Sequence, residues 1–191
     1  MKNIAIFVSG NGSNAENIAN YFASSLSAKV VLVVSDNPGA YALARAARLG
    51  IDSIVVERKS LREQGNITAA LLRERNIDLV VLAGFLSLVP HEVVAAYEGR
   101  IVNIHPALLP AYGGKGMYGD RVHTAVIENG EKESGITIHY VNERYDEGAV
   151  IAQFRIPVDA EDTPESLAAK IHALEYRHYP EVIAALLNDI A

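Results

Sequence analysis

The sequence predicts an α/β fold with a doubly wound, mostly parallel sheet, joined by antiparallel strands and a long helix toward the C-terminus. Apolar runs of strand length alternate with helical segments through the first hundred residues, which is typical of parallel strands linked by crossover helices. Beyond residue 134 two strand-like segments follow each other with only a polar loop between them, which indicates antiparallel pairing.

The composition narrows the classes of function. The chain has 191 residues, no cysteine and a formal net charge of −6, so we expect one domain over residues 1–191. A chain without cysteine has no disulfide, thiolate nucleophile or Cys-ligated metal, and the net negative charge implies no general affinity for nucleic acid. No apolar run is long enough to span a bilayer or to act as a signal peptide. We therefore expect a cytoplasmic protein without membrane or nucleic-acid partners.

The first strand and the turn after it point to an anion site. Residues 3–8 (NIAIFV) form a continuous apolar run, which suits a buried parallel strand. A turn with Gly10 and Gly12 follows, and then a helix over residues 15–25. This order makes the N-terminal half Rossmann-like, and it exposes backbone N–H groups that bind phosphate at a helix N-terminus. Ser13 and Asn14 are available to cap the helix or to donate to phosphate oxygens. A purely structural tight turn is the alternative.

The next elements continue the alternation. We expect strands over 30–34, 52–56 and 78–83, and helices over 41–49, 66–75 and 91–97. The loop between residues 57 and 65 is polar, and its Arg62 is either a ligand-facing cation or a solvated charge. The loop over residues 84–89 (GFLSLV) is unusually apolar, which suggests packing inside the protein or the wall of a pocket for a flat ligand.

The fifth strand, residues 101–105, carries the chemistry. Asn103 and His105 interrupt an apolar run, and their spacing of two puts them on one face of the strand before Pro106 ends it. An amide can donate to a developing oxyanion, and an imidazole exchanges protons near neutral pH. A structural pair, in which both side chains bond to nearby loop atoms, is the alternative.

The remaining segments complete the sheet and close the fold. A glycine-rich collar over residues 107–119 suits a lid, and Asp120 is expected to cap a helix ending near Asn129. Strands over 135–141 and 149–158 flank the polar loop 142–148. A helix begins at Thr163, and a second helical piece is expected after Pro180. The histidines at positions 91, 123, 139, 172 and 178 are interpreted as surface or packing residues, with His172 kept open because it lies near Glu175.

Taken together, these motifs resemble the folate-dependent formyltransferases, and within them the phosphoribosylglycinamide (glycinamide ribonucleotide) formyltransferases. The resemblance covers essentially the whole chain. The segments that carry it are residues 10–14 (GNGSN), 82–85 (LAGF), 103–110 (NIHPALLP), 146–148 (DEG) and 174–180 (LEYRHYP).

The resemblance implies a reaction and its catalytic residues. The amine of glycinamide ribonucleotide attacks the formyl carbon of 10-formyltetrahydrofolate, which acts as a formyl-donor co-substrate, and no metal is needed. Asn103 and His105 would stabilise the oxyanion of the tetrahedral intermediate, with His105 as the proton donor. Asp146 would hold the imidazole and favour its cationic form, or help to move the amine proton through water.

The same resemblance assigns binding residues. Gly12, Ser13 and Asn14 would hold the phosphate, and Glu175 the ribose or glycinamide part. Residues 1–100 would thus form the nucleotide-binding half, and residues 101–191 the catalytic and folate-binding half. The expected folate-binding residues are Arg62, Leu86, Ser87, Leu88, Val89, Asn103, Asn142, Glu143, Arg144, Tyr145 and Asp146.

The chain departs from the family pattern at three places. Ser87 stands where some members have arginine, the Asp146 loop reads YDEG, and the collar lacks the usual Pro-Gly segment. Three alternatives share parts of the pattern: a formyltetrahydrofolate hydrolase, a formyltransferase acting on sugar nucleotides or methionyl-tRNA, and a non-catalytic nucleotide-binding module. A monomer or homodimer is compatible with the sequence.

Overall fold

The computed structural model describes residues 1–190 and contains a seven-stranded sheet in the order β3-β2-β1-β4-β5-β6-β7. The first five strands pair in parallel, and β6 and β7 are antiparallel additions at one edge. The predicted fold class is thereby confirmed. The strands are β1 (Lys2–Val8), β2 (Ala28–Ser35), β3 (Asp52–Val55), β4 (Leu79–Leu82), β5 (Ile101–His105), β6 (Glu133–Tyr140) and β7 (Val150–Pro157).

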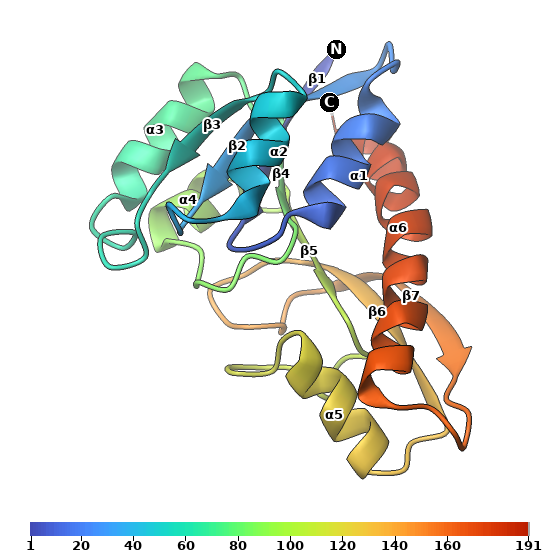
Figure 1. Cartoon of the computed structure of the whole chain (residues 1–191). Coiled ribbons are helices and arrows are strands. Elements are labelled where there is room, and N and C mark those ends of the chain that lie inside the picture. The colour runs from blue at the N-terminus through green and yellow to red at the C-terminus, as the bar shows by residue number, and fades with distance from the viewer. Residues whose placement is uncertain (191) are drawn as a thin grey trace.

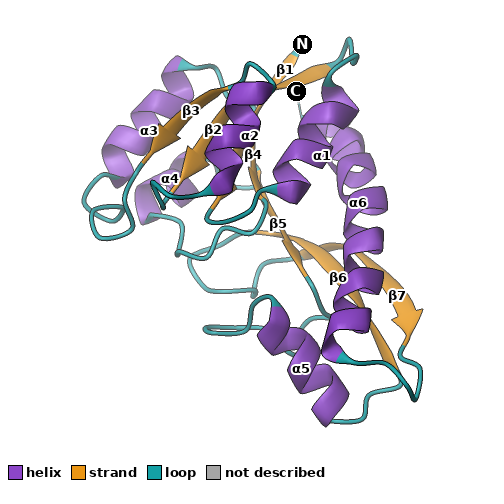
Figure 2. Cartoon of the chain, viewed as in Figure 1, coloured by secondary structure: helices purple, strands orange, loops and turns teal. Residues whose placement is uncertain are grey.

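Helices cover both faces of this sheet (Figure 1). One face packs against α1, α2, α5 and α6, and the other against α3 and α4 (Figure 2). The helices are α1 (Ser13–Phe22), α2 (Tyr41–Arg48), α3 (Gly65–Glu74), α4 (His91–Ala96), α5 (Asp120–Glu128) and α6 (Pro164–Asp189). In residues 1–190, none of them has the length and apolar character that crossing a bilayer requires.

The two-sided core explains why β1 reads as a continuous apolar run. Ile4 and Ile6 pack with α1 and α6, whereas Ala5 and Phe7 point the opposite way, toward α3 and α4. All four side chains are fully buried. A strand with a helix layer on each face has no solvent side, so the alternation of an exposed strand is absent.

The strand order reverses between β1 and β4, and this switch point determines where a ligand can bind. The chain moves outward from β1 to β2 and β3, then returns to place β4 and β5 on the other side of β1. The loops after β1 and β4 therefore diverge, which leaves a crevice at the carboxyl ends of these strands.

The end of the chain differs from the prediction in one respect, because α6 is a single helix that contains Pro180. A proline inside a helix removes a backbone N–H, and the carbonyl four residues earlier loses its partner. Here that carbonyl belongs to Tyr176, and it accepts a hydrogen bond from Asn17 Nδ2 in α1 at 2.9 Å. The α1 side chain thus replaces the missing helical bond. Asp120 is also the first residue of α5 rather than its cap, which is Gly119.

Candidate active site

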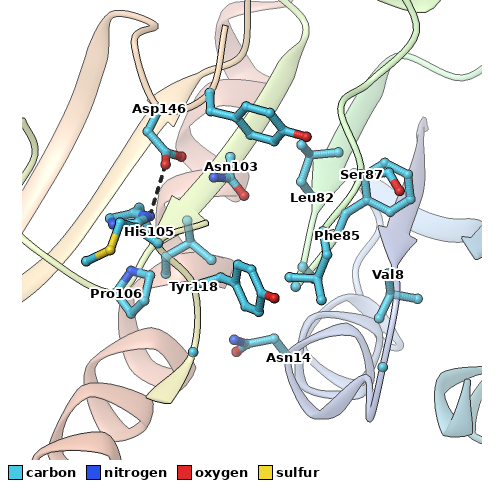
Figure 3. Close-up of a pocket in the computed structure, with 18 of the residues that line it drawn as sticks. Val8, Asn14, Leu82, Phe85, Ser87, Asn103, His105, Pro106, Tyr118 and Asp146 are labelled. Carbon is cyan, nitrogen blue, oxygen red and sulfur yellow. Dashed lines mark ion pairs between the residues drawn. The ribbon is translucent and has the colours of Figure 1, made fainter. Parts of the chain in front are cut away.

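A cavity of about 600 Å³ opens at the carboxyl ends of β1, β4 and β5. Its walls come from the turn after β1, the loop after β4, the end of β5, the glycine-rich collar and the loop between β6 and β7, together with residues of α5 and α6. Figure 3 shows Asn103 between the His105–Asp146 pair on one side and Leu82 and Phe85 on the other. The volume is in the range that holds a small organic ligand.

Asn103 is held by its partner across the sheet, His139. The two residues are opposite each other in the antiparallel β5–β6 pair. His139 Nδ1 is 2.9 Å from the Tyr140 carbonyl oxygen, so Nδ1 carries the hydrogen and donates it. The remaining nitrogen, Nε2, accepts from Asn103 Nδ2 at 3.1 Å. This bond fixes the orientation of the amide and leaves its second N–H for a ligand in the cavity.

His105 is buried and bonded on both sides. Its Nε2 donates to the carbonyl oxygen of Tyr112 at 2.7 Å, and its Nδ1 lies 3.5 Å from Asp146 Oδ2. Burial lowers the pKa of His105, and this effect exceeds the opposing influence of the Asp146 charge. The expectation that Asp146 makes the imidazole cationic is therefore wrong for the unliganded protein. Near neutral pH the ring is neutral, with Nδ1 as a free proton acceptor facing the carboxylate.

Asp146 reaches this position through a strained loop. Its φ is 57°, a left-handed conformation that is uncommon for a residue with a side chain. Gly148, two residues later, lies on the β6 backbone, where a Cβ would come within 1.7 Å of the Tyr140 carbonyl oxygen. The glycine of the Asp-x-Gly motif thus lets the loop fold back, and this turns the carboxylate toward the two histidines.

The charge of Asp146 is stabilised where it lies. Burial alone would raise the pKa of its carboxyl group, but His139, His105 and a hydrogen bond from the backbone N–H of Gly114 together bring the pKa below its usual value. The Gly114 bond is 2.9 Å long and ties the glycine-rich collar to the carboxylate. Asp146 therefore carries a negative charge near neutral pH, next to two imidazoles.

The loop after His105 is fixed by buried side chains of the neighbouring strands. Thr137 Oγ1 in β6 donates to the Ala107 carbonyl oxygen at 2.7 Å and accepts from the Leu109 N–H at 2.9 Å. Gln153 Nε2 in β7 donates to the Leu109 carbonyl oxygen, also at 2.9 Å. The antiparallel strands thus hold the NIHPALLP segment from its far side.

At the opposite end of the cavity, the turn after β1 rests on α2. The Gly10 carbonyl oxygen accepts from the Ala42 N–H at 3.2 Å. Both the carbonyl oxygen and Oδ1 of Asn11 accept from Arg45, at 3.0 and 2.8 Å. Gly12 has a φ of 76°, and a Cβ there would lie 2.5 Å from that of Ala42. No side chain caps α1, so its first N–H groups are available to an anion.

Asn14 is oriented toward α6 rather than toward this anion site. Its Nδ2 donates to Glu175 Oε2 at 2.9 Å. Because a carboxylate only accepts hydrogen bonds, the amide cannot be turned the other way, and Oδ1 is left buried without a partner. His172 Nδ1 is 3.0 Å from the same Glu175 oxygen, and this bond raises the pKa of His172. The predicted phosphate contact of Asn14 is therefore limited to its backbone N–H.

The loop after β4 supplies an apolar wall. Phe85 packs edge-on against Phe7 with ring centroids 5.3 Å apart, whereas Leu86 and Leu88 are partly exposed along the cavity. The Ser87 hydroxyl turns away and donates to Asp36 Oδ2 at 2.5 Å, and Arg58 Nε donates to the same oxygen at 3.0 Å. The apolar loop is thus held at its middle by a buried carboxylate.

Most of the predicted site residues line this cavity. They are Gly12, Ser13, Asn14, Leu86, Ser87, Leu88, Val89, Asn103, His105, Asn142, Arg144, Tyr145, Asp146 and Glu175. Two predicted folate-binding residues do not. Arg62 is exposed in the turns before α3, and the Glu143 carboxylate points to His91 Nδ1, 2.6 Å away.

His139 and His123 line the cavity although the sequence analysis interpreted them as packing residues. The alternation of β6 places Thr137 and His139 on one face, and β5 does the same for Asn103 and His105. Only the pairing register of β5 with β6 brings these two faces together. That register could have identified His139, but no local motif in β6 gives it.

Comparisons with known proteins agree with the geometry. Residues 2–183 match the family described as formyl transferase. Phosphoribosylglycinamide formyltransferase from Bacillus subtilis is 40% identical, over 98% of this chain and 96% of the relative. The chloroplastic protein of the same name from Arabidopsis thaliana is 42% identical over 98% of this chain, which spans 66% of that relative. The trifunctional purine biosynthetic protein adenosine-3 of Drosophila melanogaster is 38% identical over a segment that makes up 14% of its length.

Solved structures show the same relationship. Phosphoribosylglycinamide formyltransferase from Streptococcus pneumoniae superposes with a TM-score of 0.84 at 44% identity, covering 97% of this chain and 99% of that one. Glycinamide ribonucleotide transformylase 1 from Symbiobacterium toebii gives a TM-score of 0.90 at 35% identity, covering 99% and 89%. The chain therefore belongs to the formyl transferase family and, within it, to the phosphoribosylglycinamide formyltransferases.

Proposed function

We propose that this chain transfers the formyl group of 10-formyltetrahydrofolate to the amine of glycinamide ribonucleotide, in the de novo synthesis of purines. The observation that carries the proposal is the cavity itself. It joins an uncapped helix N-terminus, a cluster of Asn103, His105, His139 and Asp146, and an apolar wall at Leu86 and Leu88. These three parts match a phosphate, a reacting formyl group and a pterin ring.

The neutral state of His105 suits the first step. The substrate amine attacks the formyl carbon, and the electron pair of the C=O bond moves to oxygen. The free N–H of Asn103 donates to that oxyanion. His105 Nδ1 accepts the proton that the amine nitrogen loses, and Asp146, 3.5 Å away, stabilises the resulting imidazolium.

The second step returns the proton. The oxyanion reforms its double bond, the bond between the formyl carbon and the folate nitrogen breaks, and that nitrogen takes the proton from the His105 imidazolium. The formylated amide and tetrahydrofolate leave with the atoms balanced, and His105 is neutral again. No metal enters this sequence, because the substrate amine is the nucleophile.

The binding residues follow from their places along the cavity. Gly12, Ser13 and the backbone of Asn14 hold the phosphate, and Glu175 contacts the ribose or glycinamide part. Leu86 to Val89 and the loop from Asn142 to Asp146 hold the pterin. Arg62 lies outside the cavity walls, so its contact would be limited to the folate tail that extends from the opening.

Three further points belong to the same proposal. Residues 1–100 provide the nucleotide-binding half, and residues 101–191 provide the formyl chemistry and the folate site. The protein works as a monomer or homodimer on small molecules, without nucleic acid or a membrane. Its compartment is the cytoplasm.

The test is turnover of purified protein with 10-formyltetrahydrofolate, with and without glycinamide ribonucleotide, following release of tetrahydrofolate. Release only with the amine supports the proposal, whereas equal release without it indicates a hydrolase. No release in either case would favour a nucleotide-binding module or an amino-sugar acceptor. A folded His105→Ala variant with near-normal turnover would refute the catalytic assignment.

A further inference from the structure

His123, in the first turn of α5, is a buried imidazole for which the mechanism above has no use. Its side chain is 3% exposed, and it lines the cavity. Nδ1 is fully buried and has no hydrogen-bond partner among residues 1–190. The neighbouring core residues Val122 and Val126 anchor this face of α5, so the ring has a fixed position on the cavity wall.

Leaving such a nitrogen unpaired is unfavourable. A buried polar atom without a partner typically destabilises a protein by roughly 1–3 kcal/mol, and most such atoms in folded proteins are paired. A second unpartnered atom, Asn14 Oδ1, lines the same cavity. Two unpaired polar atoms in one cavity indicate a ligand that supplies the missing hydrogen bonds.

The surroundings of His123 define the chemistry of that ligand. Burial lowers the pKa of His123, so the ring is neutral near pH 7 and offers no charge to a phosphate. The charged group that acts most strongly on the imidazole is the Glu175 carboxylate, and Glu175 is itself bonded to Asn14. A carboxylate and an amide oxygen accept hydrogen bonds and repel an anion, so this part of the wall suits hydroxyl groups.

We propose that His123 is a further ligand-binding residue, whose Nδ1 forms a hydrogen bond with a ribose hydroxyl of the ribonucleotide substrate. The inference rests on the proposed function, since it takes glycinamide ribonucleotide as the ligand. A ribose hydroxyl both donates and accepts, so it satisfies Nδ1 in either tautomer and can also donate to Asn14 Oδ1.

The experiment measures binding rather than turnover. Titration calorimetry without folate gives the Kd of glycinamide ribonucleotide and of its 2′-deoxy and 3′-deoxy analogues. The variants are His123→Leu, which removes the polar ring, and His123→Asn, which keeps a polar atom near the place of Nδ1. His178→Leu is the matched control, because that ring stacks on Phe154 with centroids 3.8 Å apart and is not part of the cavity wall.

We expect His123→Leu to weaken ribonucleotide binding about 3- to 10-fold, the usual effect of one neutral hydrogen bond. His123→Asn should recover part of this loss, and His178→Leu should bind as the wild type does. The decisive result concerns the analogues. Removing the hydroxyl that faces His123 should weaken wild-type binding, and His123→Leu should then cause no further loss with that analogue.

Two results overturn the inference while leaving the proposed function intact. One is unchanged ribonucleotide affinity in folded His123→Leu, and the other is an equal loss with all three ligands. If His123→Leu does not fold, the same comparison with His123→Asn decides, because that variant must also lose its effect with one analogue. If the wild-type protein binds no glycinamide ribonucleotide, the proposed function fails and this inference fails with it.

Discussion

Replacing Asp146 by asparagine tests the role of the carboxylate most directly. The change keeps the shape of the side chain, and an amide oxygen can still accept the hydrogen bond from Gly114 N–H, which is 2.9 Å long. What it removes is the negative charge that lies 3.5 Å from His105 Nδ1. In the proposed mechanism that charge matters only after the imidazole has taken up a proton.

The size of the effect follows from the distance. Two unit charges 3.5 Å apart attract by about 5 kcal/mol at the effective dielectric constant of about 20 that suits such sites. The cavity is open to water on one side, so we expect a loss of about 3 to 5 kcal/mol in the barrier. Turnover should then fall roughly 10²- to 10⁴-fold, and the KM values of both substrates should change little.

The assay is steady-state formyl transfer by wild type, Asp146→Asn, His105→Asn and the double variant. If the carboxylate acts through the imidazolium, adding Asp146→Asn to His105→Asn should have a small further effect. His139→Gln serves as a control for the other partner, whose Nε2 lies 3.6 Å from Asp146 Oδ1. A folded Asp146→Asn enzyme within fivefold of wild-type turnover would show that the reasoning is wrong.

Three further predictions follow from the same geometry. Asn103→Ala should raise the barrier by roughly 3 to 4 kcal/mol, the usual loss for one oxyanion donor; single-turnover formyl transfer measures it, and a change below about tenfold contradicts it. His105 and His123 have pKa values that burial lowers below 6.5 in the folded protein, so the unfolded state binds more protons as the pH falls below 6.5. The free energy of unfolding, measured with urea between about pH 5 and pH 8, should therefore decrease with acidity, and less steeply in His123→Leu. Gly148→Ala would place a Cβ 1.7 Å from the Tyr140 carbonyl oxygen, so activity should be lost together with a lower melting temperature, and an unchanged melting curve would argue against this packing.

Local patterns were sufficient to predict the sheet and its helices. Continuous apolar runs identified the buried parallel strands, because β1 is covered on both faces. The glycine-rich turn and the Asn103/His105 spacing identified the two ends of the cavity, because each depends on residues close together in the chain. These are the features that residue type and spacing determine directly.

Other features depend on contacts between distant segments. The continuity of α6 through Pro180 requires the amide of Asn17, which is 159 positions away from the carbonyl it satisfies. The neutral state of His105 depends on how deeply the ring is buried, whereas the sequence indicated only the carboxylate beside it. The role of His139 likewise depends on a cross-strand register. Three-dimensional burial and pairing decide each of these cases, and local sequence does not encode them.

The clasp between α1 and α6 has a consequence for how the protein is made. Asn14 and Asn17 on α1 bond to Glu175 and to the Tyr176 carbonyl oxygen on α6, and α6 follows every other described element in chain order. During synthesis the nucleotide site therefore stays incomplete until the last helix docks, long after the phosphate turn has emerged from the ribosome. Ligand bound across this clasp favours the docked state by mass action, so substrate would act as a folding aid for the newest part of the chain.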